Sequence, residues 1–184
     1  ILPFEFTGFA DTIDTYLTEL EELATDMRSE TERTNTLIEE GAYAVALNPT
    51  ESLGPPKLES PVPYFNFAPL SNSLERLKNA AVAYEEALAG SNVEGDEIAE
   101  LNALLYSSER LLPRDAGLAG RPWYRHHIYA PGFYTGYGVK TIPGVREAIE
   151  QRSDELVDSQ IQLAASVIDD MAARIEAATA YFAL

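Results

Sequence analysis

The chain has 184 residues, 46% of them hydrophobic and 23% charged, which is the composition of one globular domain large enough to bury a core. Its 30 acidic and 13 basic side chains give a net charge of −17, which disfavours phosphate-rich partners, so we expect neither nucleic-acid binding nor direct membrane contact. The absence of cysteine excludes disulfides and thiolate metal sites.

The N-terminal part predicts a helix from about Gly8 to Met27, with Thr7 suited to cap it. Its apolar stripe is Phe9, Ile13, Tyr16, Leu17, Leu20, Leu23 and Met27. Residues 30–47 either extend this helix or form a second short one, because they carry little apolar surface. The proline-rich residues 48–63 then break the helical pattern, since proline cannot continue a helix interior, and predict an exposed loop.

Two further helices are expected, at about 71–89 and 95–112. The first has apolar residues at Leu70, Leu74, Leu77, Ala81, Tyr84 and Leu88. The second has them at Ile98, Leu101, Leu104, Leu105 and Leu112. Gly90 and Pro113 follow the two stripes and are suited to end them.

Residues 114–142 differ, because they are rich in glycine and aromatic residues and show neither a helical nor an alternating period. We expect an irregular, functional segment there. From Pro143 onwards the pattern is helical again, with a possible break near 153–159. The fold class is therefore all-α: a four-helix bundle-like domain with a long Gly/aromatic-rich loop between the third and last helices. Its predicted core includes Leu17, Leu20, Leu77, Leu101, Leu105, Leu163, Val167, Met171 and Ile175.

Few residues suggest chemistry of their own. His126 and His127 are adjacent, and neighbouring side chains of an extended segment point in opposite directions, so one metal is not expected to take both. We expect one histidine to be packed and hydrogen-bonded and the other to be exposed. The acidic pairs Glu39-Glu40, Glu85-Glu86 and Asp169-Asp170 are typical of solvated surface. We therefore expect no catalytic residue, no metal site and no cofactor in this chain.

One segment is distinctive: Gly117-Leu118-Ala119-Gly120-Arg121-Pro122-Trp123-Tyr124-Arg125-His126-His127-Ile128-Tyr129-Ala130-Pro131. It resembles the signature loop of the transferrin receptor-like dimerisation domain, which occurs in zinc peptidases of the glutamate carboxypeptidase type. Tyr137, Pro143-Gly144 and the opening Leu2-Pro3-Phe4 also match the family pattern. The resemblance runs from Leu2 to Phe182, as a single domain over 1–184, with 27–62 as an insertion that holds the proline-rich loop at 48–63.

The resemblance implies a non-catalytic homodimerisation domain that also packs against the peptidase domain of its own parent protein. The zinc ligands and catalytic glutamate would belong to that peptidase domain, which is absent here, and an extracellular or lumenal compartment is expected. The opening on Ile1 rather than Met agrees with a fragment of a longer protein. The implied domain-interface residues are Arg121, Trp123, Tyr124, Arg125, His126 and Tyr129.

The resemblance also implies a wall of the parent's substrate pocket. In glutamate carboxypeptidases a Lys-Tyr pair in this loop binds the carboxylate of a C-terminal glutamate. Here Tyr137 matches the tyrosine, but Gly136 stands at the lysine position, and Lys140 is the nearest substitute in sequence. Two alternatives stay open: a protein-binding domain of a catalytically dead, transferrin receptor-like parent, and a freestanding helical binding bundle.

Overall fold

The computed structural model describes residues 4–43, 56–91, 96–133, 136 and 138–183. Long helices dominate it: α1 (Phe6–Glu39), α3 (Ala68–Ala89), α4 (Asp96–Tyr106) and α6 (Asp154–Thr179). The short helix α5 (Pro143–Glu150), the 3-10 helices η1 (Ser108–Leu111) and η2 (Ala180–Ala183), and the strands β1 (Tyr129–Pro131) and β2 (Val139–Thr141) complete the described elements. The predicted all-α class is confirmed.

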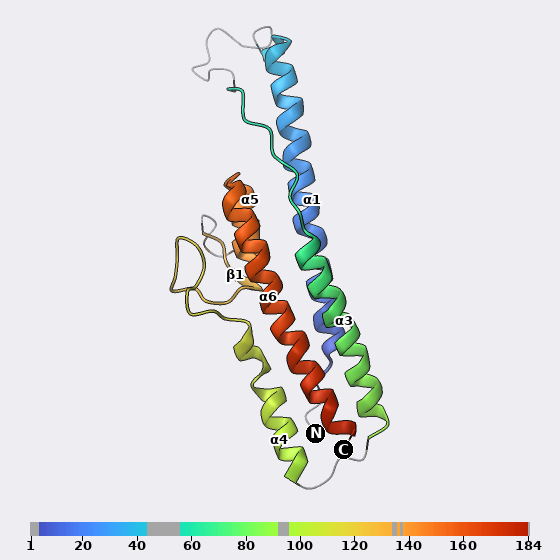
Figure 1. Cartoon of the computed structure of the whole chain (residues 1–184). Helices are drawn as coiled ribbons and strands as arrows, with labels where there is room; N and C mark the ends of the chain where they lie inside the picture. Colours follow the sequence, from blue (N-terminus) through green and yellow to red (C-terminus); the bar gives the residue numbers. More distant parts are fainter. Residues whose placement is uncertain (1–3, 44–55, 92–95, 134–135, 137, 184) are drawn as a thin grey trace.

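The four long helices pack side by side, with α6 lying between α3 and α4 (Figure 1). Their inner stripes follow the 3.6-residue helical period and form one apolar core. The predicted core residues Leu17, Leu20, Leu77, Leu101, Leu105, Val167, Met171 and Ile175 are all buried. Leu163 was predicted wrongly: it is only half-buried, because it precedes the buried Ala164 by one residue and so points about 100° away around α6.

The first helix is continuous from Phe6 to Glu39, so residues 30–39 extend it rather than form a second helix. It does not begin at Thr7 as a cap. Instead the backbone N–H and hydroxyl of Thr7 donate to Glu85 Oε1 of α3, at 3.1 and 2.7 Å. Glu85 thereby accepts from one of the otherwise unpaired N–H groups at the start of α1, and the expectation that it is simply solvated is wrong.

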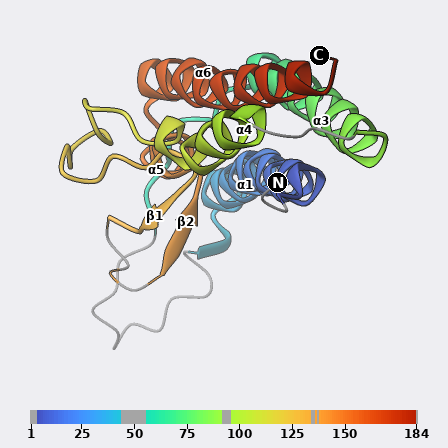
Figure 2. The same ribbon diagram turned by 90° about the horizontal axis from the view of Figure 1, so that it is seen from below.

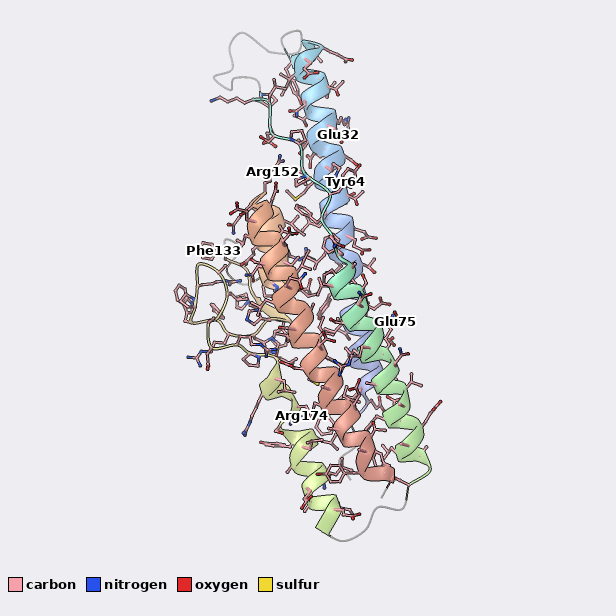
Figure 3. All side chains as sticks on the ribbon, in the orientation of Figure 1. Glu32, Tyr64, Glu75, Phe133, Arg152 and Arg174 are labelled. Carbon is pink, nitrogen blue, oxygen red and sulfur yellow. The ribbon has the colours of Figure 1, made fainter. Side chains whose placement is uncertain are left out.

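The end of α1 projects beyond α5 and α6, and the extended residues 56–67 run back along it (Figure 1). Arg28 donates to the carbonyls of Val62 and Pro63 at 3.1 and 2.7 Å, and its guanidinium stacks on the ring of Tyr64. Arg152, which lies between α5 and α6 and is labelled in Figure 3, forms an ion pair with Glu59 of this extended segment at 2.5 Å. Part of the predicted loop at 48–63 lies outside the described residues; of the rest, Val62 is buried instead of exposed.

The C-terminal half departs from prediction at two places. The expected helix at 95–112 ends at Tyr106 and continues as η1, with Arg174 of α6 donating to the carbonyl of Leu104 at 3.1 Å. The segment 114–142, expected to be irregular, contains an antiparallel ribbon in which Ala130 pairs with Lys140. The predicted break in the last helix is present, but it falls at 151–153 and overlaps the expected range 153–159 only at Ser153.

Candidate functional site

Residues 113–127 form a loop that extends beyond the helices, and the strands β1 and β2, which follow it in the chain, form a ribbon (Figure 2). The base of the loop is closed by backbone pairing, since Arg114 N donates to Arg125 O at 2.9 Å. Its narrow part is closed again where Leu118 N donates to Tyr124 O at 2.7 Å. Gly117 has φ +65°, and a Cβ there would lie 2.2 Å from Pro122 O, so only glycine fits this turn.

A buried ion pair anchors this segment to α5. Arg121 donates to Glu147 Oε1 at 2.6 Å, and the two side chains are 3% and 7% exposed. The same carboxylate oxygen accepts from the backbone N–H of Phe133 at 2.9 Å. Arg121 also donates to the carbonyl of Pro131. Arg121 was predicted to belong to the domain interface, but its guanidinium binds groups of its own domain. Any contact with another domain would therefore involve the residues next to Arg121.

Two aromatic rings flank this buried arginine. The Arg121 guanidinium carbon lies 5.1 Å from the centroid of the Tyr124 ring and 5.9 Å from that of Phe133. Trp123 packs at 6.5 Å from Tyr124, yet it is 71% exposed, and Phe133 is 44% exposed. Phe133, labelled in Figure 3, lines a small pocket between the loop and α5 together with Gly120 and Glu147. We call Trp123, Tyr124, Tyr129 and Phe133 the aromatic face.

Two histidines lie at the base of the loop. His127 is buried, and burial together with the positive charge of Arg114 and neighbouring His126 lowers its pKa to about 4. His126 is half-buried rather than exposed as expected for one of the pair; its Nδ1 accepts from the N–H groups of Ile128 and Tyr129 at 3.3 and 3.2 Å. Burial also lowers the pKa of His126, against the opposing charge of Glu109. Both rings are therefore neutral at pH 7.

The ribbon carries the position that the sequence assigned to a substrate pocket. Gly136 lies in the turn between β1 and β2, is exposed, has φ +60° and has open space where a side chain would extend. Tyr137 lies outside the described residues. Lys140 forms an ion pair with Glu150 at the end of α5, 2.5 Å away, so its ammonium already has a carboxylate partner. Arg125, also predicted to be at the interface, is largely exposed and contacts Asp115 at 3.1 Å.

The sequence matches the model of the transferrin receptor-like dimerisation domain over residues 65–176, a range that holds α3, the loop, the ribbon and most of α6. More than half of the chain is covered. The chain belongs to the transferrin receptor-like dimerisation domain family.

Two relatives of this dimerisation domain are named as probable glutamate carboxypeptidases. One, from Arabidopsis thaliana, is 43% identical over 84 residues, which is 44% of this chain and 12% of the relative. The other, from Arthroderma benhamiae, is 34% identical over 89 residues, which is 48% of this chain and again 12% of the relative. The chain therefore aligns with only about one eighth of the length of these relatives.

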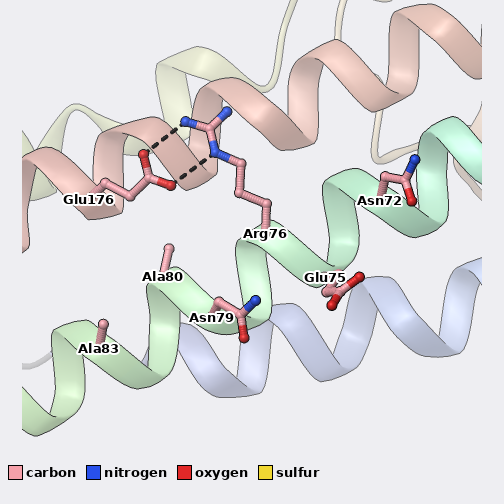
Figure 4. Close-up of a pocket in the computed structure, with 7 residues that line it drawn as sticks. All are labelled: Asn72, Glu75, Arg76, Asn79, Ala80, Ala83 and Glu176. Atoms are coloured by element: carbon pink, nitrogen blue, oxygen red, sulfur yellow. Dashed lines mark hydrogen bonds and ion pairs between the residues drawn. The ribbon is translucent and has the colours of Figure 1, made fainter.

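Elsewhere on the dimerisation domain the polar clusters are ion pairs on the surface. A shallow pocket between α3 and α6 is lined by Arg76, whose fork binds Glu176 through two nitrogens at 2.9 and 2.8 Å (Figure 4). This guanidinium lowers the pKa of Glu176. Asp169 and Asp170, expected to be solvated, contact Arg76 and Arg114 respectively. These charges pair with one another and leave little for a ligand to neutralise.

The described part of the dimerisation domain contains neither a metal-ligand cluster nor a helix suited to span a membrane. Within it, no three His, Asp or Glu side chains are grouped in a way that could hold a metal ion. No helix among these residues is both long and apolar enough to cross a membrane.

Sequence reasoning missed Glu147, the central carboxylate of the site. A signal for it existed, because Glu147 lies among Val145, Ala148 and Ile149 on the apolar side of a short amphipathic helix. A carboxylate in such a position needs a buried cation or several hydrogen-bond donors to offset its desolvation. The sequence could have predicted a buried partner for Glu147, although not that Arg121 supplies it.

Proposed function

We propose that this domain is the non-catalytic homodimerisation domain of a glutamate carboxypeptidase-like zinc exopeptidase, and that its loop and ribbon form one wall of the parent's substrate pocket. The observation that carries the proposal is the aromatic face: four exposed rings on the loop and ribbon, two of which flank the buried, anchored Arg121, within the range matched by the dimerisation family. Exposed aromatic clusters are typical of protein interfaces. The peptidase domain would cover this face, and Trp123, Tyr124, Arg125, His126 and Tyr129 would contact it or support that contact.

The first test is the assembly and activity of the full-length protein. Sedimentation velocity is expected to show a dimer, and hydrolysis of peptides from the C-terminus is expected to require zinc, whereas the 184-residue chain alone should hydrolyse nothing. A dimer without peptidase activity would favour the alternative of a catalytically dead, transferrin receptor-like parent. A full-length protein consisting of this domain alone would favour the freestanding bundle.

Within this proposal, the substrate is expected to end in a residue less acidic than glutamate. Gly136 brings no positive charge to the ribbon turn, and the nearest candidate, Lys140, is paired with Glu150. The hydroxyl of Tyr137 would instead donate to the terminal carboxylate. Such a hydrogen bond to a charged group contributes about 1.5–3 kcal/mol.

Tyr137→Phe is therefore expected to lower kcat/KM of the full-length protein by about 10- to 150-fold while the dimer is retained. Gly136→Lys supplies the missing charge and should shift preference towards C-terminal glutamate, despite some strain at its positive φ. The measurement is kcat/KM over peptides that differ only in their last residue. An unchanged profile for both variants would remove the ribbon turn from the pocket.

A further inference from the structure

The geometry around Glu147 joins three segments that are separate in the sequence. Glu147 is held on α5, Arg121 belongs to the loop, and Pro131 and Phe133 lie where the ribbon enters its turn. Arg121 uses one terminal nitrogen for Glu147 and the other for the Pro131 carbonyl. The first backbone hydrogen bond of the ribbon turn is next to these contacts in the chain: Gly132 N donates to Gly138 O at 2.8 Å.

The cost of this arrangement indicates that it does more than stabilise the fold. A buried ion pair gains little over apolar residues of similar size, because both charges must leave water. Here the Nε–H of Arg121 also has no acceptor in the described part of the chain, which adds a further desolvation cost. The pair instead imposes a defined geometry. The planar guanidinium binds Glu147 and the Pro131 carbonyl through two different nitrogens, so both partners are held at fixed positions.

Two other contacts between the ribbon and α5 hold the opposite strand, β2: Arg146 donates to the hydroxyl of Thr141 at 3.0 Å, and Lys140 forms an ion pair with Glu150. The side chains of Lys140 and Glu150 are 20% and 32% exposed. Partly exposed pairs of this sort are screened by water and contribute little. Since β2 also leads directly into α5, that strand is held in several ways, whereas the β1 end of the turn is held to α5 by the buried pair.

We propose that Arg121 and Glu147 are positioning residues, which hold Pro131 and Phe133, at the β1 end of the ribbon turn, against α5 and so fix where Gly136 stands relative to the substrate. The second half of this inference rests on the proposed function. Neither side chain touches the substrate itself, since both are buried beneath the aromatic face. Their removal would loosen the turn while leaving the helical core intact.

The test uses three variants of the full-length protein. Arg121→Lys keeps the buried positive charge but offers one nitrogen in place of two, so it cannot reproduce the fork. Glu147→Gln keeps the size and an acceptor oxygen but removes the negative charge. Glu150→Gln is the matched control, because it breaks the other ion pair between the ribbon and the same helix.

Amide hydrogen exchange, followed by mass spectrometry, should be about tenfold faster for peptides covering 129–138 in Arg121→Lys and Glu147→Gln, and unchanged in peptides of α6. Glu150→Gln should leave both regions close to wild type. In peptidase assays the first two variants should raise KM about tenfold with kcat retained, since a misplaced wall weakens binding of the terminal residue.

Exchange that is unchanged at 129–138 in Arg121→Lys would overturn the positioning proposal, whatever the protein's activity. Exchange that rises equally in α6 would also overturn it, because it would show a general loss of stability. A wild-type protein without peptidase activity would instead overturn the proposed function, and the exchange data would still decide whether the pair holds the turn.

Discussion

Leu77→Ala is expected to lower the free energy of unfolding by about 2–5 kcal/mol. Leu77 is fully buried in α3, the helix that packs most extensively against α6. Truncation removes the transfer free energy of the lost methyl and methylene groups and leaves a cavity in a core contributed by several helices. Denaturant unfolding of wild type and variant, followed by circular dichroism at 222 nm, gives the difference.

The control is the same substitution at a half-buried position. Leu163→Ala removes identical atoms from α6, but Leu163 is not part of the buried cluster, so its cost should be about 1 kcal/mol or less. Similar losses of stability for the two variants would contradict the burial of Leu77 in the core and the half-exposed position of Leu163.

The contrast between these two leucines shows which buried residues the helical period of the sequence can predict. Leu77, Leu101 and Ile175 were predicted to be buried because each lies on a repeating stripe of its own helix, and the structure buries them. Leu163 is a leucine next to such a stripe, and hydrophobicity alone could not assign its direction. Helix type and core are therefore largely readable from sequence, whereas a single residue at a stripe edge is decided by neighbouring helices.

The site was less predictable, because its contacts join residues far apart in the chain. Strands β1 and β2 have three residues each, too few for an alternating pattern to be recognised. Arg121 was identified through the family motif, but its burial and its partner Glu147, 26 residues away, depend on the tertiary fold. Glu85 likewise contacts Thr7 across 78 residues, a contact that no local pattern indicates.

Acid is expected to destabilise the domain through His127. Its pKa is about 4 when folded, below the ordinary value of 6.5, because burial and the charge of Arg114 disfavour the protonated ring. Above pH 6.5 both folded and unfolded states are neutral at this residue, so the full stability is present. Between pH 6.5 and 4 the unfolded state takes up a proton that the folded state does not, and stability falls with pH.

The size of the effect follows from the shift. At about 1.4 kcal/mol per pH unit, roughly 2 kcal/mol is lost by pH 5 and about 3 kcal/mol by pH 4. His127→Phe keeps a ring but cannot titrate, so the variant should lose correspondingly less stability between pH 7 and 5. All other titratable groups are the same in the two proteins, so the difference between the two pH profiles isolates His127.

The location of His127 also predicts which part of the domain opens first in acid. Its backbone N–H donates to Leu112 O at 3.2 Å, where the loop leaves η1, and the neighbouring His126 supports Ile128 and Tyr129 of the ribbon. A protonated His127 beside the guanidinium of Arg114 would be driven towards water, which releases the base of the loop before the helices separate. At pH 5, exchange should therefore rise in peptides covering 112–131 more than in α3 or α6, and His127→Phe should remove the excess. An acid-induced rise of equal size in the variant would show that carboxylates, not this histidine, control the opening.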